Sequence, residues 1–180
     1  MKDSLLGPLI TSKTRLKLLL RFFINPALDG YLQGLAKELE ENTNSVRVEL
    51  DRLESAGMLT SQTEGRRKLY QANMNHPLTS DLISMLRKVT GVEDLIDRIV
   101  DRVGGLKQVW VTGKLAQGLE SDELEVFLVG DEFDMDYLGE LFEKIGKHLK
   151  RTVHFMVTPV LSAGLAKESL LVWAQETNAK

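Results

Sequence analysis

The stretch from Asn42 to Met74 constrains the fold most, because it joins a helical pattern directly to a hairpin pattern. Three apolar residues stand at i, i+4 and i+7 and predict one buried stripe along a helix: Val46, Leu50 and Leu53. Gly57 follows, at the place where a helix end favours glycine. Two short strand-like runs, 58–63 and 68–73, then flank a glycine-containing turn at 64–66. The stretch therefore predicts a helix followed at once by a two-stranded hairpin.

Two earlier segments carry the same helical spacing. Residues 13–24 predict a helix capped by Ser12 or Thr11 and ended by Pro26, and residues 32–40 predict a second one. Three helices with matching apolar stripes, short connections and a trailing hairpin can enclose one small core. This is the pattern of a helix-turn-helix extended by a wing.

The third helix also predicts a polar outward face. With its apolar stripe inward, the residues that point outward or flank that side are Thr43, Asn44, Ser45, Arg47, Val48, Asp51, Arg52 and Ser55. In a major groove, Asn44 could pair with adenine, Val48 could meet a thymine methyl group, and the arginines could reach guanine or phosphate. Asp51 would repel phosphates unless it pairs with Arg47 or Arg52. The alternative is that this face is merely solvated or packs on a partner.

The hairpin tip strengthens the DNA hypothesis. Arg66, Arg67 and Lys68 are three consecutive cations that could reach a minor groove or the phosphate backbone. A charge run is usually only a solvated surface, but its place directly after an outward-facing polar helix favours nucleic-acid binding.

Composition limits the remaining classes of protein. The 180 residues are 43% hydrophobic and 27% charged, as in an ordinary globular protein of one large or two small domains. No apolar run approaches the roughly 20 residues of a membrane-spanning helix. The first residues, with Lys2 and then Pro8, do not predict a secretory signal, so we expect a cytoplasmic protein. Without cysteine, and with three histidines that lack metal-pair spacing, the chain predicts no metal site and no cofactor.

Charge divides unevenly along the chain. Residues 1–76 hold 11 Lys/Arg and 9 Asp/Glu, a net charge of +2, whereas residues 77–180 hold 12 and 17, a net charge of −5. This polarity suits a DNA-binding half attached to an acidic domain with another role. Because the positive charge of this half is small, we expect the affinity for DNA to come from a homodimer with two DNA-binding domains.

A family resemblance agrees with this pattern. The segments TSKTRLKLLLRFFINP, YLQGLAKELEENTNSVRVELDRLESAGML and EGRRKLYQANMNHPL resemble the arsenic-repressor-like (ArsR-like) winged helix of prokaryotic transcriptional regulators. They are especially similar to a subgroup in which a nucleotidyltransferase-like domain follows. The resemblance implies a regulator that binds operator DNA as a dimer.

The second half of the chain alternates strands and helices. Two amphipathic helices between His76 and Gly105 can link the halves, pair with a second chain or simply form local core. After them the patterns predict three strands, at 106–112, 124–129 and 153–158. They also predict a helix at 135–150 and a final helix at 162–175, and thus a small α/β domain. Trp110 and Trp173 are interpreted as core residues on a strand and on the final helix.

The second half also resembles a minimal nucleotidyltransferase core with an altered motif. In that core a strand ends in Gly-Ser and the next strand carries Asp-x-Asp, which holds two metal ions. Here Gly113 and Lys114 stand at the first position and Glu123 and Glu125 at the second, while the third strand has His154. Longer carboxylates disfavour the geometry of a two-metal site, so we expect no catalytic residues and no metal. The two glutamates can simply face water, or the four residues Gly113, Lys114, Glu123 and Glu125 can form a ligand-binding pocket.

The sequence thus predicts an α+β protein with a winged helix at 1–76, linker or dimerisation helices at 77–105, and a small nucleotidyltransferase-like domain at 106–180. The favoured hypothesis is a homodimeric regulator that binds double-stranded DNA and is not an enzyme, with a small-molecule effector as a further candidate partner. Two alternatives stay open: a metal-dependent nucleotidyltransferase carrying a winged helix, and a protein-interaction module.

Overall fold

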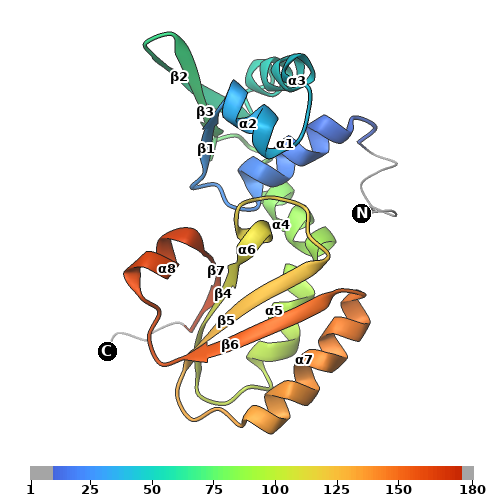
Figure 1. Ribbon diagram of the computed structural model, residues 1–180, viewed down its shortest axis with the longest axis vertical. Coiled ribbons are helices and arrows are strands. Elements are labelled where there is room, and N and C mark those ends of the chain that lie inside the picture. The colour runs from blue at the N-terminus through green and yellow to red at the C-terminus, as the bar shows by residue number, and fades with distance from the viewer. Residues whose placement is uncertain (1–9, 176–180) are drawn as a thin grey trace. The chain divides into compact units, whose positions relative to one another are not determined.

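The computed structural model describes residues 10–175, so the expectation on Lys2 and Pro8 lies outside the described residues. The chain divides into two compact units. One holds the residues up to Val89 together with Gly118–Glu120, and the other holds the rest of the chain from Thr90. Both units mix helices and strands, which confirms the α+β class (Figure 1). Within the described range, no helix has the length and apolar character needed to cross a bilayer.

The first unit is a winged helix. Its elements are α1 (Lys13–Phe23), β1 (Asp29–Tyr31), α2 (Leu32–Glu38), α3 (Thr43–Ser55), β2 (Leu59–Glu64), β3 (Arg67–Ala72) and α4 (Thr79–Thr90). The three expected helices and both strands of the hairpin are confirmed to within one or two residues. The hairpin projects from the unit, with α2 and α3 to one side of it (Figure 1).

Local sequence sets where α1 and α3 begin and end. The Ser12 hydroxyl caps α1 by accepting a hydrogen bond from the Arg15 backbone N–H at 3.2 Å, as expected. Asn42 caps α3 through a bond from the Asn44 N–H at 2.8 Å. At the other end of α3, Gly57 has φ +73° and Met58 N–H bonds back to the Leu53 carbonyl at 3.0 Å. This is the glycine-terminated helix end that the sequence predicts.

A strand that the sequence patterns did not reveal completes the wing. The three-residue β1 pairs antiparallel with β3, so the small sheet has the order β1-β3-β2. A side chain at Gly30 would lie 2.8 Å from the Leu35 side chain, so only glycine lets β1 lie this close to α2. The hairpin turn is Gly65-Arg66, with Gly65 at φ +62°, between the paired residues Glu64 and Arg67.

The second unit contains one four-stranded sheet. Its elements are α5 (Val92–Val100), β4 (Leu106–Thr112), α6 (Gly113–Ala116), β5 (Glu123–Gly130), α7 (Met135–Leu149), β6 (Thr152–Thr158), α8 (Ala163–Glu168) and β7 (Leu170–Ala174). The strand order is β6-β5-β4-β7. β5 and β6 are parallel and the other two pairs are antiparallel, so the sheet is mixed.

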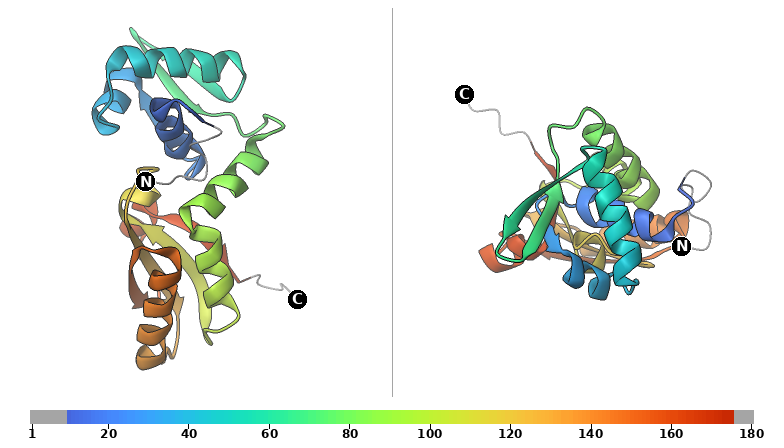
Figure 2. Two further views of the ribbon diagram at one scale, coloured as in Figure 1. Left: turned by 90° about the vertical axis from the view of Figure 1, so that its right-hand side faces the viewer. Right: turned by 90° about the horizontal axis from the view of Figure 1, so that it is seen from above.

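Helices cover one face of this sheet. α5 and α7 lie side by side over it (Figures 1 and 2), and the buried core there includes Val109, Val111, Leu124, Val126, Leu128, Leu138, Leu141, Phe142 and Ile145. Phe142 of α7 stacks on Phe155 of β6 at 4.4 Å between ring centroids. The alternation along β5 buries Leu124, Val126 and Leu128, as the sequence predicts.

The expected final helix at 162–175 is wrong. The helix α8 ends at Glu168, and residues 170–174 form β7, which pairs with the edge of β4. Leu170 and Val172 are buried while Leu171 between them is 40% exposed, which is the alternation of a strand. The run Leu-Leu-Val-Trp is too short to distinguish the periodicity of a helix from that of a strand. It forms a strand because it pairs with the otherwise open edge of β4. Trp173 therefore lies on a strand, where it is half-buried.

Both expected linker helices are present as α4 and α5. Leu82 and Leu86 of α4 are buried, as are Leu95 and Ile99 of α5, so these apolar stripes do contribute to local core. Pairing of these helices with a second chain stays a prediction.

Candidate nucleic-acid interface

The polar side of α3 is open to solvent. All six residues predicted on this helix as DNA contacts are exposed: Thr43, Asn44, Ser45, Arg47, Val48 and Arg52. Val48 is 40% exposed, which is unusual for a valine on a helix whose other apolar residues are almost fully buried. The helix therefore presents a continuous surface with donors, acceptors and one apolar contact.

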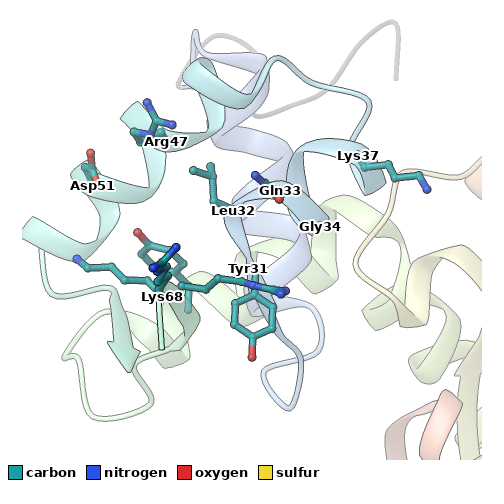
Figure 3. Close-up of a pocket in the computed structure, with 11 residues that line it drawn as sticks. Tyr31, Leu32, Gln33, Gly34, Lys37, Arg47, Asp51 and Lys68 are labelled. Carbon is teal, nitrogen blue, oxygen red and sulfur yellow. The ribbon is translucent and has the colours of Figure 1, made fainter. Parts of the chain in front are cut away.

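A cationic groove lies beside this helix. It has a volume of about 670 Å³, and α2, α3 and the hairpin contribute its walls (Figure 3). Five of its lining residues are cations and one is an anion, a net charge of +4: Lys37, Arg47, Arg66, Arg67 and Lys68 against Asp51. The structure thus brings the three predicted wing cations together with Arg47 of α3. Such a concentration of positive charge attracts polyanions.

Sequence reasoning missed the contribution of α2 to this groove. Tyr31, Leu32, Gln33, Gly34 and Lys37 form part of the wall and come from the end of β1 and from α2. The cation at Lys37 was visible in the sequence. Its place in the wall of the groove was not, because that depends on how β1 and α2 pack beside the hairpin.

Tyr31 anchors one side of the hairpin. Its hydroxyl donates a hydrogen bond to the Glu64 carboxylate, and the Arg67 guanidinium lies 5.6 Å from the centre of its ring. The hydrogen bond to Glu64 raises the pKa of the Tyr31 phenol, and burial and the Glu64 charge act in the same direction, while the charge of Arg67 opposes them. Arg67 is consequently held against an aromatic face rather than extended freely into solvent.

Glu54 anchors the other side of the hairpin to α3. The Ser61 hydroxyl donates to its Oε1 at 2.5 Å, and the Lys68 ammonium lies 3.2 Å from its Oε2. The Ser61 hydrogen bond and then the Lys68 contact lower the pKa of Glu54, and the Glu54 hydrogen bond raises the pKa of Lys68. Part of the positive charge of Lys68 is therefore compensated within the protein.

Arg52 is also engaged, on the opposite flank of α3. It lies 3.0 Å from Glu49, a carboxylate that is only 6% exposed and that also bonds to Arg15 at 2.8 Å and Ser12 at 2.9 Å. Burial raises the pKa of Glu49, but the bonds from Arg15 and Ser12 and the charges of both arginines outweigh it and lower the pKa overall. The sequence allows Asp51 to pair with Arg52, but in the structure Arg52 pairs with Glu49.

The candidate ligand site in the second unit is only partly assembled. Gly113 has φ +65°, and a Cβ there would lie 2.2 Å from Glu125 Oε1, so the carboxylate of Glu125 rests directly against this glycine. Lys114 and Glu123 are exposed, and His154 stands opposite Glu125 in the register of β5 and β6. Among residues 10–175 no group of three or more His, Cys, Asp or Glu side chains is arranged to hold a metal ion.

Comparisons with known proteins give distant structural similarities. No protein-family profile matches the chain, and no curated protein matches it. A mutant form of the toxin–antitoxin pair MntA–HpeT matches at 18% identity and a TM-score of 0.41, over 47% of this chain and 73% of the other. HlyU from Vibrio cholerae matches at 17% and 0.37, over 46% and 82%, and the transcriptional regulator BldR from Sulfolobus solfataricus at 16% and 0.37, over 55% and 68%. These values are too low to carry information on function.

Proposed function

We propose that this protein is a transcriptional regulator that binds double-stranded DNA through its winged helix. The observation that supports this best is the cationic groove between the hairpin and the exposed polar side of α3. A helix of this kind fits a major groove, where Asn44 offers both a donor and an acceptor to adenine and Val48 offers a methyl contact to thymine. The groove beside it suits the phosphate backbone, and the hairpin tip then reaches the neighbouring minor groove. This function places the protein in the cytoplasm.

The proposed regulator acts as a homodimer whose second unit joins the two copies. Four apolar residues of the four-stranded sheet form a row in register across all its strands: Leu171, Trp110, Phe127 and Met156. Leu171 and Met156 are 40% and 45% exposed, and the two aromatic residues are half-buried. The row alternates with the buried face that packs on α5 and α7. The same row in a second copy can pack against this row when a two-fold axis relates the two copies. Each row then runs in the opposite direction to the other, so that the two apolar surfaces cover each other.

We infer that the second unit is not catalytic and has kept the frame of a nucleotide-binding fold as a sensor. The carboxylate of Glu125 lies directly against Gly113, and the described residues offer no third carboxylate beside it for a two-metal site. An effector that contacts Lys114 and the backbone near Gly113 would alter the geometry of the dimer and so its affinity for DNA. Absence of metal-dependent nucleotide turnover in the wild-type protein, matched by a Glu125→Gln variant, is the expected result, and turnover abolished by that substitution would contradict it.

The test of DNA binding uses Asn44→Ala. Binding of the full-length protein to a pool of random duplexes, measured by fluorescence anisotropy, is expected for both wild type and variant. Because Asn44 faces base edges rather than phosphates, the variant should select a less defined sequence while its affinity for random DNA stays within about twofold. Wild-type protein that binds no duplex at any salt concentration would overturn the proposal.

A further inference from the structure

Asp51 is a carboxylate placed among cations on the outward side of α3. It is exposed and lines the groove together with Arg47 and the wing cations. The two other carboxylates of this helix, Glu49 and Glu54, are each held by hydrogen bonds and ion pairs. Across the described part of the chain, Asp51 has no such side-chain bond, and neither Arg47 nor Arg52 pairs with it. Asp51 therefore contributes an accessible negative charge to a groove that is otherwise lined by cations.

Arg47 and Asp51 stand one helical turn apart on the same side of α3 (Figure 3). Four residues of α-helix span about 6 Å, which is close to two base-pair steps of about 3.4 Å. Within residues 10–175 neither side chain makes a hydrogen bond or an ion pair, and Asp51 acts on the wing only through its charge near Lys68, so both are accessible to a partner that approaches the groove. With α3 in a major groove, the two side chains would face base pairs at most two steps apart.

The chemistry of the two side chains selects their partners. An ionised aspartate only accepts hydrogen bonds, so phosphates repel it, and it can be satisfied only by a donor on a base edge. In the major groove, cytosine offers only its N4 amino group, whereas adenine presents the acceptor N7 beside its amino group and would repel a carboxylate. Arginine only donates and matches the two acceptors of guanine, N7 and O6.

Resting on the proposed function, we propose that Asp51 is a specificity-determining residue that accepts a hydrogen bond from cytosine. Arg47 reads a guanine within two base pairs of it. In sequences without this cytosine, the Asp51 carboxylate faces phosphates or base acceptors that repel it. Asp51 therefore lowers the affinity for those sequences as well as raising the affinity for the recognised one. The recognised half-site then contains a G and a C at a fixed spacing, next to any A or T contacted by Asn44 and Val48.

The experiment selects bound sequences from a random duplex library with full-length wild type, Asp51→Asn and Asp51→Ala. Asp81→Asn is the matched control, since it removes the same charge from an exposed position on α4. Wild type and control are expected to select the same site. The Asp51 variants should lose the preference for cytosine at one position by about tenfold or more, while their affinity for unrelated sequences rises. The Asn variant, which both donates and accepts, should shift that position toward adenine.

Two results would overturn the inference, and they differ from each other. If Asp51→Asn and Asp51→Ala select the wild-type site with undiminished preference at every position, Asp51 does not read a base, although the protein remains a DNA-binding protein. If wild type enriches no sequence and binds no duplex, the proposed function fails, and this inference fails with it. Urea denaturation of each variant checks that the fold is retained, which the lack of any side-chain bond at Asp51 predicts.

Discussion

Individual charged residues in the winged helix divide into two groups. Glu49 and Glu54 hold the fold together through Arg15, Ser12, Ser61 and Lys68, whereas Arg66 and Asp51 have no side-chain bond within residues 10–175. The sequence predicts which residues are charged and which side of α3 is polar. It could not predict which cations are already compensated, because the partners of Arg52 and Lys68 depend on how α1, α3 and the hairpin pack.

Glu49 is expected to matter for stability. Its carboxylate is 6% exposed and bonds to two arginines and a serine. Glu49→Gln removes the charge and leaves both arginines less well paired, so the free energy of unfolding should fall by about 1.5 to 3 kcal/mol. Urea denaturation at neutral pH measures this, with the exposed Asp51→Asn on the same helix as control. Equal stability of wild type and Glu49→Gln would contradict the assigned network.

Glu54 is expected to make stability depend on pH. The hydrogen bond from Ser61 and then the contact with Lys68 lower the pKa of Glu54 in the folded protein below its ordinary value. The unfolded chain therefore binds a proton first as the pH falls, so this stabilisation is complete above about pH 5 and is lost as the pH drops through the folded pKa. The stability difference between wild type and Glu54→Gln should shrink over that acid range in denaturation measured from pH 7 to 3. A difference that grows as the pH falls would show that the sign is wrong.

Among the elements, those with strong local patterns were predictable and those that depend on pairing were not. Helix α3, its glycine end and the hairpin follow from spacing and turn chemistry in one stretch of sequence. The three residues of β1 are too few to carry a pattern, and their strand exists because β3 offers an edge. β7 likewise is short, and its strand depends on pairing with β4 rather than on a pattern of its own. The sequence consequently predicts the exposed side of α3 and the cations of the wing, but neither the groove between them nor the wall that β1 and α2 supply.

Within the hairpin, Arg66 and Lys68 should behave differently. Arg66→Ala removes a cation that no side chain among residues 10–175 pairs with, so the slope of log affinity against log salt should flatten by about 0.9 per wing with no change in stability. Lys68→Ala should flatten it less and should lower stability, since Glu54 loses a partner. Salt titrations of DNA binding and urea denaturation separate the two effects. Identical behaviour of the two variants in both measurements would contradict the pairing of Lys68 with Glu54.

The apolar row on the sheet of the second unit is expected to form the dimer contact. Met156→Glu and Leu171→Glu place charges at the two ends of the apolar row and should convert the proposed dimer to monomers. Sedimentation velocity measures this, with Val160→Glu, an exposed apolar position beyond β6, as a control expected to remain dimeric. Dimers that persist in both row variants would assign the contact to another surface.

At the scale of the whole molecule, charge is distributed to suit two tasks. Residues 1–76 carry a net charge of +2 within a chain of −3, and their cations gather in the groove beside α3, where the proposed contact with DNA lies. Two such surfaces in a dimer double the number of phosphate contacts, which offsets the modest charge of one. The acidic remainder of the chain limits binding elsewhere on the surface.

The most direct measurement is the affinity of the full-length protein for duplex DNA across a salt gradient, for wild type and for the variant Arg66→Ala/Arg67→Ala/Lys68→Ala. The account predicts that wild type binds, that log affinity falls linearly with log salt, and that the folded triple variant binds every sequence more weakly with a slope flatter by about two to three per wing. A folded triple variant that binds DNA with unchanged affinity and slope would contradict the central role of the wing and its groove.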